Sequence, residues 1–245
     1  MADEGHAPIS QRLADLAQYR ADLLLSAQGQ TASLRWQQVF VPLQQVLREY
    51  ELPIGLLLDL LDAFEQDVHK TAAAAGYADR TELLDYCRRS ANPIGRLLLH
   101  LYKIDDAKAL AQSDSICTAL QLINFWQDLS VDIPRGRYYL PQADCASAGV
   151  CWDGSGCYSS DAALNELLAQ LCSWTQAIMR SGQSLALQVP GRAGWELRLV
   201  VQGGLCVLER VRQLGAQALH TRPKLHTWDA PALLWHALRM GRSVP

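Results

Sequence analysis

The sequence lacks the features that would take it across or into a membrane. No uncharged apolar run reaches the roughly 20 residues that a bilayer-spanning helix needs. The opening residues, MADEGHAP, have neither the basic start nor the apolar core of a secretory signal. These absences predict a cytoplasmic protein and leave peripheral contact with the inner membrane open.

Cysteine pairs and excess positive charge are also lacking. The seven cysteines form an odd set without a CxxC pair, so we expect reduced thiols. Cys145, Cys151 and Cys157 lie in one polar stretch, but their spacing does not match that of zinc ligands. A formal net charge of -3 argues against a nucleic-acid partner.

What the sequence does contain is helical periodicity. With 49% hydrophobic residues in 245, the chain can bury a large core. Apolar residues recur at intervals of three and four, which is typical of half-buried helices. The predicted helices cover residues 9–27, 33–50, 53–68, 80–102, 107–133, 161–188 and 193–219. We therefore predict one all-α domain over residues 1–245, with a Gly- and Pro-rich loop at about 134–160.

Local signals refine these helices. Asp79 and Glu82 have the spacing of a capping box, and Pro53 suits a first helical turn. Pro93 should kink the helix at 80–102, and Gly95 should let the backbone of this helix approach a neighbour. His100 is interpreted as a hydrogen-bonded core residue.

One predicted helix carries a row of oxygen-bearing side chains. At about 100° per residue, Gln121, Asn124, Asp128 and Asp132 fall on one face, with successive turns ~5.4 Å apart. Such oxygen atoms suit Mg²⁺ and a metal-bound diphosphate. Spacing alone equally fits a solvated polar stripe, but Arg135 and Arg137 follow, and guanidinium groups suit phosphate.

Two motifs resemble the squalene/phytoene synthase family. NFWQDLSVDIPRGRYYLP, from Asn124 to Pro141, is similar to the second aspartate-rich motif of that family, and LLDYCRRSANPIGRLLLHLY, from Leu83 to Tyr102, to its central helix. The resemblance implies an all-α isoprenoid synthase (class I terpenoid synthase) helical bundle. RLVVQGGLCVLERV and RPKLHTWDAPALLWHAL extend it across the chain, closest to the bacterial hydroxysqualene synthases of hopanoid biosynthesis.

That resemblance implies an enzyme that converts presqualene diphosphate and water to hydroxysqualene and diphosphate. Two alternatives stay open: head-to-head condensation of prenyl diphosphates to presqualene diphosphate, squalene or phytoene, and a noncatalytic scaffold that binds prenyl lipids. The implied partners are a prenyl diphosphate substrate and other enzymes of the squalene pathway. The implied cofactor is Mg²⁺.

The resemblance also assigns roles to residues. Asn124, Asp128 and Asp132 would bind the metal and diphosphate, with Gln121 beside them as a substrate contact. Arg137 and Tyr139 would steady the diphosphate or the loop that closes over it. Tyr86 would line the prenyl pocket. For Tyr86 and Tyr139 a packing role in the core is the alternative, and for Arg137 an interaction with the helix dipole.

The family's first acidic motif, DDxADEG, is only partly present. The chain begins MADEGHAP, so Asp3 alone maps onto the end of that motif as a metal ligand. We therefore expect an N-terminally truncated sequence with reduced or absent activity. Loss of an opening helix would also uncover an apolar trough, which predicts lower stability or self-association.

Overall fold

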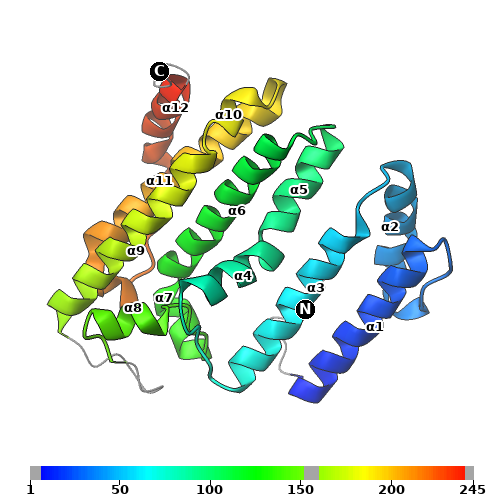
Figure 1. The fold of residues 1–245 in the computed structure, drawn as a ribbon, viewed down its shortest axis with the longest axis horizontal. Coiled ribbons are helices and arrows are strands. Elements are labelled where there is room, and N and C mark those ends of the chain that lie inside the picture. The colour runs from blue at the N-terminus through cyan, green and yellow to red at the C-terminus, as the bar shows by residue number, and fades with distance from the viewer. Residues whose placement is uncertain (1–6, 152–159, 241–245) are drawn as a thin grey trace.

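The computed structural model describes residues 7–151 and 160–240, which form helices and no strand (Figure 1). The α-helices are α1 (Ile9–Ala27), α2 (Gln37–Glu49), α3 (Ile54–Ala72), α4 (Arg80–Ser90), α5 (Asn92–Leu101), α6 (Ala107–Gln127), α7 (Leu129–Asp132), α8 (Gln142–Ser147), α9 (Asp161–Gly182), α10 (Leu185–Gln188), α11 (Gly191–Leu214) and α12 (Ala230–Arg239). Short 3₁₀ helices are η1 (Leu34–Trp36), η2 (Ile133–Arg135), η3 (Gly215–Leu219) and η4 (Thr227–Asp229).

Helix α6 lies at the centre of the larger hydrophobic core. It packs against α5 on one side and against α9 and α11 on the other (Figure 1). Leu122, Phe125 and Trp126 are at most 2% exposed. The buried indole nitrogen of Trp126 donates a 2.9 Å hydrogen bond to Thr175 Oγ1 of α9, which fixes the two helices against each other. The core therefore holds α6, which carries the predicted site.

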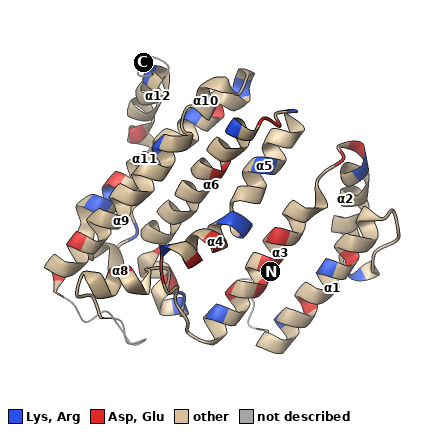
Figure 2. Ribbon diagram, viewed as in Figure 1, with Lys and Arg blue, Asp and Glu red and all other residues tan. Residues whose placement is uncertain are grey.

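A second hydrophobic cluster joins α1, α2 and α3. Its buried residues are Leu16, Leu23, Phe40, Leu47, Leu61 and Val68. Acidic residues recur along α3, with basic residues on α1 (Figure 2), and Arg20 of α1 pairs with Asp62 of α3 at 2.5 Å. Because α3 also packs against α4 and α5, it connects this cluster to the main core.

The predicted kink near Pro93 is a complete break between two helices. Ala91 leaves helical geometry, with φ −121° and ψ −46°, and α5 starts with Pro93 in its first turn. Proline lacks the amide hydrogen that would continue the α4 ladder, so the single helix predicted for 80–102 divides in two. The close approach predicted at Gly95 is confirmed, because an added Cβ would overlap Ser113 and Cys117 of α6.

The loop predicted at about 134–160 contains helical structure. Residues 133–135 form η2 and Gln142–Ser147 form α8, so the prediction of an uninterrupted loop was wrong. The amides of Gln142 and Ala143 donate 2.9 Å hydrogen bonds to the carbonyls of Tyr77 and Ala78. These contacts satisfy the amides at the start of α8 and hold it against a segment that is distant in sequence.

Other local predictions are close to the structure. Asp79 accepts a 2.9 Å bond from the Glu82 amide and caps α4, whereas Pro53 is the residue just before α3 rather than inside its first turn. His100 Nε2 lies 2.7 Å from the Tyr50 carbonyl oxygen. Cys145 and Cys151 are not joined in a disulfide bond in the part of the chain that the structure describes, and Cys157 lies outside it. None of the helices that the structure describes is long and apolar enough to cross a membrane.

Candidate functional site

Asp128 occupies a break at the end of α6. Its backbone, with φ −100° and ψ 12°, separates α6 from the single turn of α7, so the helix predicted to continue to residue 133 ends earlier. Both carboxylate oxygens face Arg222: its Nε donates a short hydrogen bond to Oδ1, and its Nη2 donates to Oδ2 at 3.2 Å. The ion pair joins positions 94 residues apart in sequence.

Asp132, at the end of α7, acts on the same guanidinium through its negative charge. The hydrogen bond to Asp128, and then the negative charges of Asp128 and Asp132, raise the pKa of Arg222 above its usual value. Asp132 is 9% exposed, and its backbone carbonyl accepts a 3.0 Å hydrogen bond from the Arg137 amide. Asp128 thus contacts a cation directly, and Asp132, one turn later, adds its negative charge to the surroundings of that cation.

Asn124 and Gln121 occupy the preceding turns of α6. Asn124 is exposed and Gln121 is half-buried. From Asn124 through Asp128 to Asp132 the residues become progressively more enclosed, and the backbone break at Asp128 interrupts the regular helical row that the spacing predicted. Asp128 is paired with an arginine rather than with solvent alone.

The oxygen atoms of this row suit a hard divalent cation. Amide and carboxylate oxygens are the donors that Mg²⁺ prefers, and Arg222 shows that the carboxylates accept a positive charge here. In residues 7–151 and 160–240, no group of three or more His, Cys, Asp or Glu side chains could hold a metal ion. The row supplies two carboxylates and one amide, and Asp3 lies outside the described residues.

Tyr86 of α4 is buried beside a carboxylate of α3. Its hydroxyl donates a 2.6 Å hydrogen bond to Asp67 Oδ2, and the residue is only 4% exposed. Burial, followed by the charge of Asp67, raises the pKa of Tyr86. Its phenol therefore stays protonated at physiological pH.

Tyr139 takes the packing role that the sequence left open. It is 8% exposed, and its ring stacks on Phe125 of α6 with centroids 3.8 Å apart and an interplanar angle of 9°. The ring centroid of Tyr86 lies 6.0 Å from that of Phe125 and 6.4 Å from that of Tyr139, so these three rings pack together. Arg137 lines a small cleft together with Asp67 and Tyr139.

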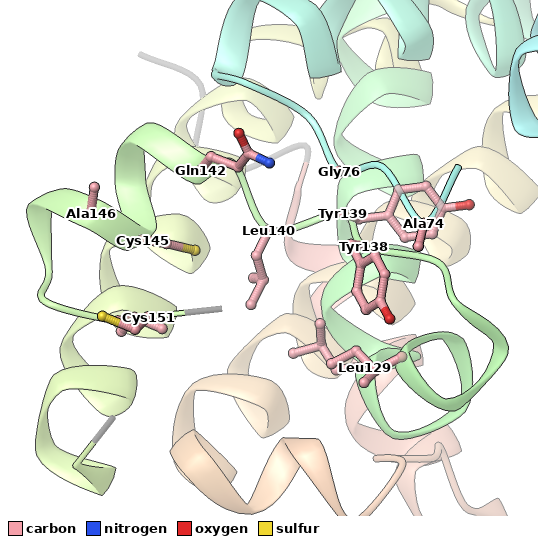
Figure 3. A pocket seen from close by; sticks show the side chains of 12 residues that line it. Ala74, Gly76, Leu129, Tyr138, Tyr139, Leu140, Gln142, Cys145, Ala146 and Cys151 are labelled. Atoms are coloured by element: carbon pink, nitrogen blue, oxygen red, sulfur yellow. The ribbon is translucent and has the colours of Figure 1, made fainter. Parts of the chain in front are cut away.

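A cavity of about 480 Å³ adjoins α7. Leu129, Leu140 and Tyr138 surround the hollow, with Cys145 and Cys151 on the side of α8 (Figure 3). Leu129 follows Asp128 directly in sequence, so the turn that presents carboxylates to Arg222 also contributes an apolar wall. Of the predicted metal ligands that the structure describes, none lines this cavity.

Sequence reasoning missed two residues that the structure places at this site. Asp67 contacts Tyr86 across 19 positions, and Arg222 contacts Asp128 across 94. Neither residue belongs to the row of oxygen-bearing side chains that the helical spacing predicted. The only available signal for Arg222 was its place in the C-terminal stretch RPKLHTWDAPALLWHAL, which gives no indication of a carboxylate partner.

Comparison with known proteins agrees with the motifs. The chain is 33% identical over 162 residues to hydroxysqualene synthase from Rhodopseudomonas palustris, covering 65% of this chain and 54% of that protein. It is 30% identical over 205 residues to hydroxysqualene synthase from Zymomonas mobilis, covering 82% of this chain and 65% of that protein. The chain thus spans about half to two thirds of the length of these relatives.

The fold agrees with that of a solved relative. The crystal structure of squalene synthase HpnC from Alicyclobacillus acidocaldarius matches with a TM-score of 0.75 and 29% identity, over 88% of this chain and 78% of that chain. The expected all-α isoprenoid synthase fold is confirmed. The model of the squalene/phytoene synthase family matches residues 1–229. This chain therefore belongs to the squalene/phytoene synthase family.

Proposed function

We propose that this protein is a Mg²⁺-dependent, hydroxysqualene synthase-like enzyme that converts presqualene diphosphate and water to hydroxysqualene and diphosphate. The observation that carries this proposal is the ion pair of Asp128 with the Arg222 guanidinium, one turn before Asp132, whose negative charge also acts on that guanidinium. The similarity to two hydroxysqualene synthases supports this substrate and product over others.

In this proposal, Asn124, Asp128 and Asp132 hold the metal, and the arginines bind diphosphate oxygens. When bound, Mg²⁺ supplies positive charge that stabilises the departing diphosphate. Arg222 is placed to add a guanidinium fork, whose donors match phosphate oxygens. Stabilisation of the leaving group is the main contribution to catalysis that this site can make.

The bonds broken and formed in the proposed reaction balance. The carbon–oxygen bond to the diphosphate breaks and both bonding electrons leave with the diphosphate. The oxygen of one water molecule attacks the resulting carbocation and gives up one proton. Tyr86 stays a neutral phenol because its pKa is raised, so it places no phenolate near the cation. The rings of Phe125 and Tyr139 help to exclude further water.

The test is turnover of presqualene diphosphate in water enriched in oxygen-18. We expect pyrophosphate release that requires Mg²⁺, with hydroxysqualene carrying the heavy oxygen in its hydroxyl group. Asp132→Asn should lower kcat roughly 100- to 1,000-fold, the usual cost of losing one stabilising group at the developing charge. The matched control is Asp114→Asn on the preceding helix α6, whose side chain pairs with Arg96. Release that persists without metal or in Asp132→Asn would contradict the proposal.

The same assay separates the two alternatives. A condensing enzyme would consume farnesyl diphosphate and form presqualene diphosphate, squalene or phytoene. A scaffold would bind a prenyl diphosphate without releasing pyrophosphate. Mass spectrometry of the lipid products, with each substrate supplied separately, shows whether hydroxysqualene, a condensation product or no product is formed.

A further inference from the structure

The ion pair between Arg222 and Asp128 engages both oxygens of the aspartate. Two nitrogen atoms of the guanidinium, Nε and Nη2, face the two carboxylate oxygens. The Asp128 side chain is 17% exposed and that of Arg222 is 40% exposed, so the arginine lies on the solvent side of the pair. Any other cation that binds Asp128 must therefore compete with Arg222 for its two carboxylate oxygens.

A metal ion and Arg222 cannot share this position without repulsion. Both carry positive charge, and like charges a few ångströms apart oppose each other strongly at a partly enclosed site. Diphosphate changes this balance, because its oxygens offer the displaced guanidinium a new bidentate partner. The arrangement thus makes binding of metal alone unfavourable and binding of metal with diphosphate favourable.

The backbone next to Arg222 is held in place. Pro223 is buried, and its carbonyl accepts a 2.7 Å hydrogen bond from Gln127 Nε2 at the end of α6. Arg210 of α11 donates to the Lys224 carbonyl and pairs with Asp229 at 2.5 Å. Because the 221–226 segment is anchored on two helices, an exchange of partners requires only rotation of the Arg222 side chain.

We propose that Arg222 is an exchangeable counter-ion, which occupies Asp128 in the absence of ligand and moves to the diphosphate when metal and diphosphate bind together. This inference rests on the proposed function, because it assumes that Asp128 binds metal. It adds a coupling between two ligands that the metal-binding row alone does not provide. Arg222 then acts as a positioning residue for the metal and as a contact for the diphosphate.

Titration of Mn²⁺ with and without inorganic pyrophosphate, followed by calorimetry, tests this exchange. For the unmodified protein we expect weak Mn²⁺ binding that pyrophosphate strengthens, by a coupling of roughly 5- to 150-fold. Arg222→Gln should bind Mn²⁺ alone more tightly than the unmodified protein and lose most of the strengthening by pyrophosphate. Arg222→Lys, which keeps the charge but not the fork, should give intermediate coupling.

Arg96→Gln is the matched control. Arg96 uses the same two nitrogens, Nε and Nη2, against both oxygens of Asp114, at 2.9 and 2.6 Å, so its loss removes an equivalent ion pair elsewhere on α6. Arg96→Gln should leave the affinity for Mn²⁺ unchanged, both with and without pyrophosphate. Thermal unfolding of each variant shows whether it is folded, and Arg222→Lys serves as the test if Arg222→Gln is not.

The possible failures are distinguishable. If Asp128→Asn abolishes Mn²⁺ binding while Arg222→Gln leaves affinity and coupling unchanged, the proposed metal site stands and the exchange is wrong. Weaker binding of Mn²⁺ alone to Arg222→Gln would also overturn the exchange. If neither the unmodified protein nor Arg222→Gln binds Mn²⁺ under any of these conditions, the proposed function fails and the exchange fails with it.

Discussion

Tyr86 and Asp67 form a hydrogen bond at a site where both partners are largely enclosed. The phenol donates to the carboxylate at 2.6 Å, and Tyr86 has almost no contact with solvent. Hydrogen bonds to charged groups stabilise a fold more than neutral ones, and a partner left unpaired keeps its desolvation cost. This pair therefore stabilises the fold in addition to any part it plays in the active site.

Tyr86→Phe should lower the free energy of unfolding by about 1–2 kcal/mol, since it leaves Asp67 without this donor. Urea denaturation measures the change, and Tyr102→Phe is the control because the Tyr102 side chain is half exposed. In a double-mutant cycle with Asp67→Asn, the two changes should be non-additive. Additive losses would show that the hydroxyl and the carboxylate do not interact.

Two buried thiols predict a loss of stability in alkaline solution. Burial raises the pKa of Cys87 to about 12 and that of Cys172 to about 11. An unfolded cysteine ionises near pH 8.5, so the unfolded chain releases protons first and stability falls as pH rises above that value. Urea denaturation at about pH 7.5 and about pH 9, where an unfolded tyrosine is still roughly nine-tenths protonated, measures the fall. It should be smaller in Cys87→Ala/Cys172→Ala, and an equal fall would contradict this assignment.

Spacing in the sequence was sufficient to find one row of candidate ligands but not the residues that complete the site. Asn124, Asp128 and Asp132 are related by helical geometry, which acts over a few residues and can be read from the sequence. Asp67 reaches Tyr86 through the packing of α3 on α4, and Arg222 reaches Asp128 from the non-helical segment between η3 and η4. Contacts of that kind depend on the whole fold, so no local pattern predicts them.

At the level of helices, α6 and α9 approach so closely that glycine is required. A Cβ on Gly182 of α9 would overlap the backbone carbonyl of Gln112 in α6. A backbone oxygen cannot rotate away as the end of a side chain can, so the helices would have to separate. The contact between α6 and α9 therefore fixes how α6 sits in the core.

Gly182→Ala should destabilise the protein by about 1–3 kcal/mol, as overpacking of a close helix contact does. Gly55→Ala on α3 is the matched control, because nothing lies within 4 Å of its added Cβ and alanine favours the helix by up to about 1 kcal/mol. The melting temperature and the urea midpoint should both fall for Gly182→Ala and both rise for Gly55→Ala. Equal shifts would mean that helix propensity, and not the close contact, governs position 182.

Helix positions were predictable where apolar periodicity is long. The first predicted helix, 9–27, has the bounds of α1, and the segment predicted at 161–188 covers α9 and α10. The break at Asp128 and the helix α8 were not predictable. The first lies where Asp128 pairs with the distant Arg222, and the second where Gln142 and Ala143 donate hydrogen bonds to a distant segment.

For the molecule as a whole, apolar side chains remain exposed on α5. Ile94, Leu98 and Leu101 are 48%, 53% and 44% exposed, and Phe64 of the neighbouring helix α3 is 42% exposed. Contiguous apolar surface of this kind favours association between molecules. The expected self-association of the isolated chain thus stays a prediction, with an exposed surface to support it.

The central claim is that Asn124, Asp128 and Asp132 bind a divalent metal together with diphosphate. Calorimetric titration of inorganic pyrophosphate in the presence and absence of Mg²⁺ tests it most directly, with Asp132→Asn and the surface control Asp114→Asn alongside. We predict stoichiometric binding that requires Mg²⁺, is lost in Asp132→Asn and is retained in Asp114→Asn. Pyrophosphate binding that needs no metal, or that survives in Asp132→Asn, would contradict this account.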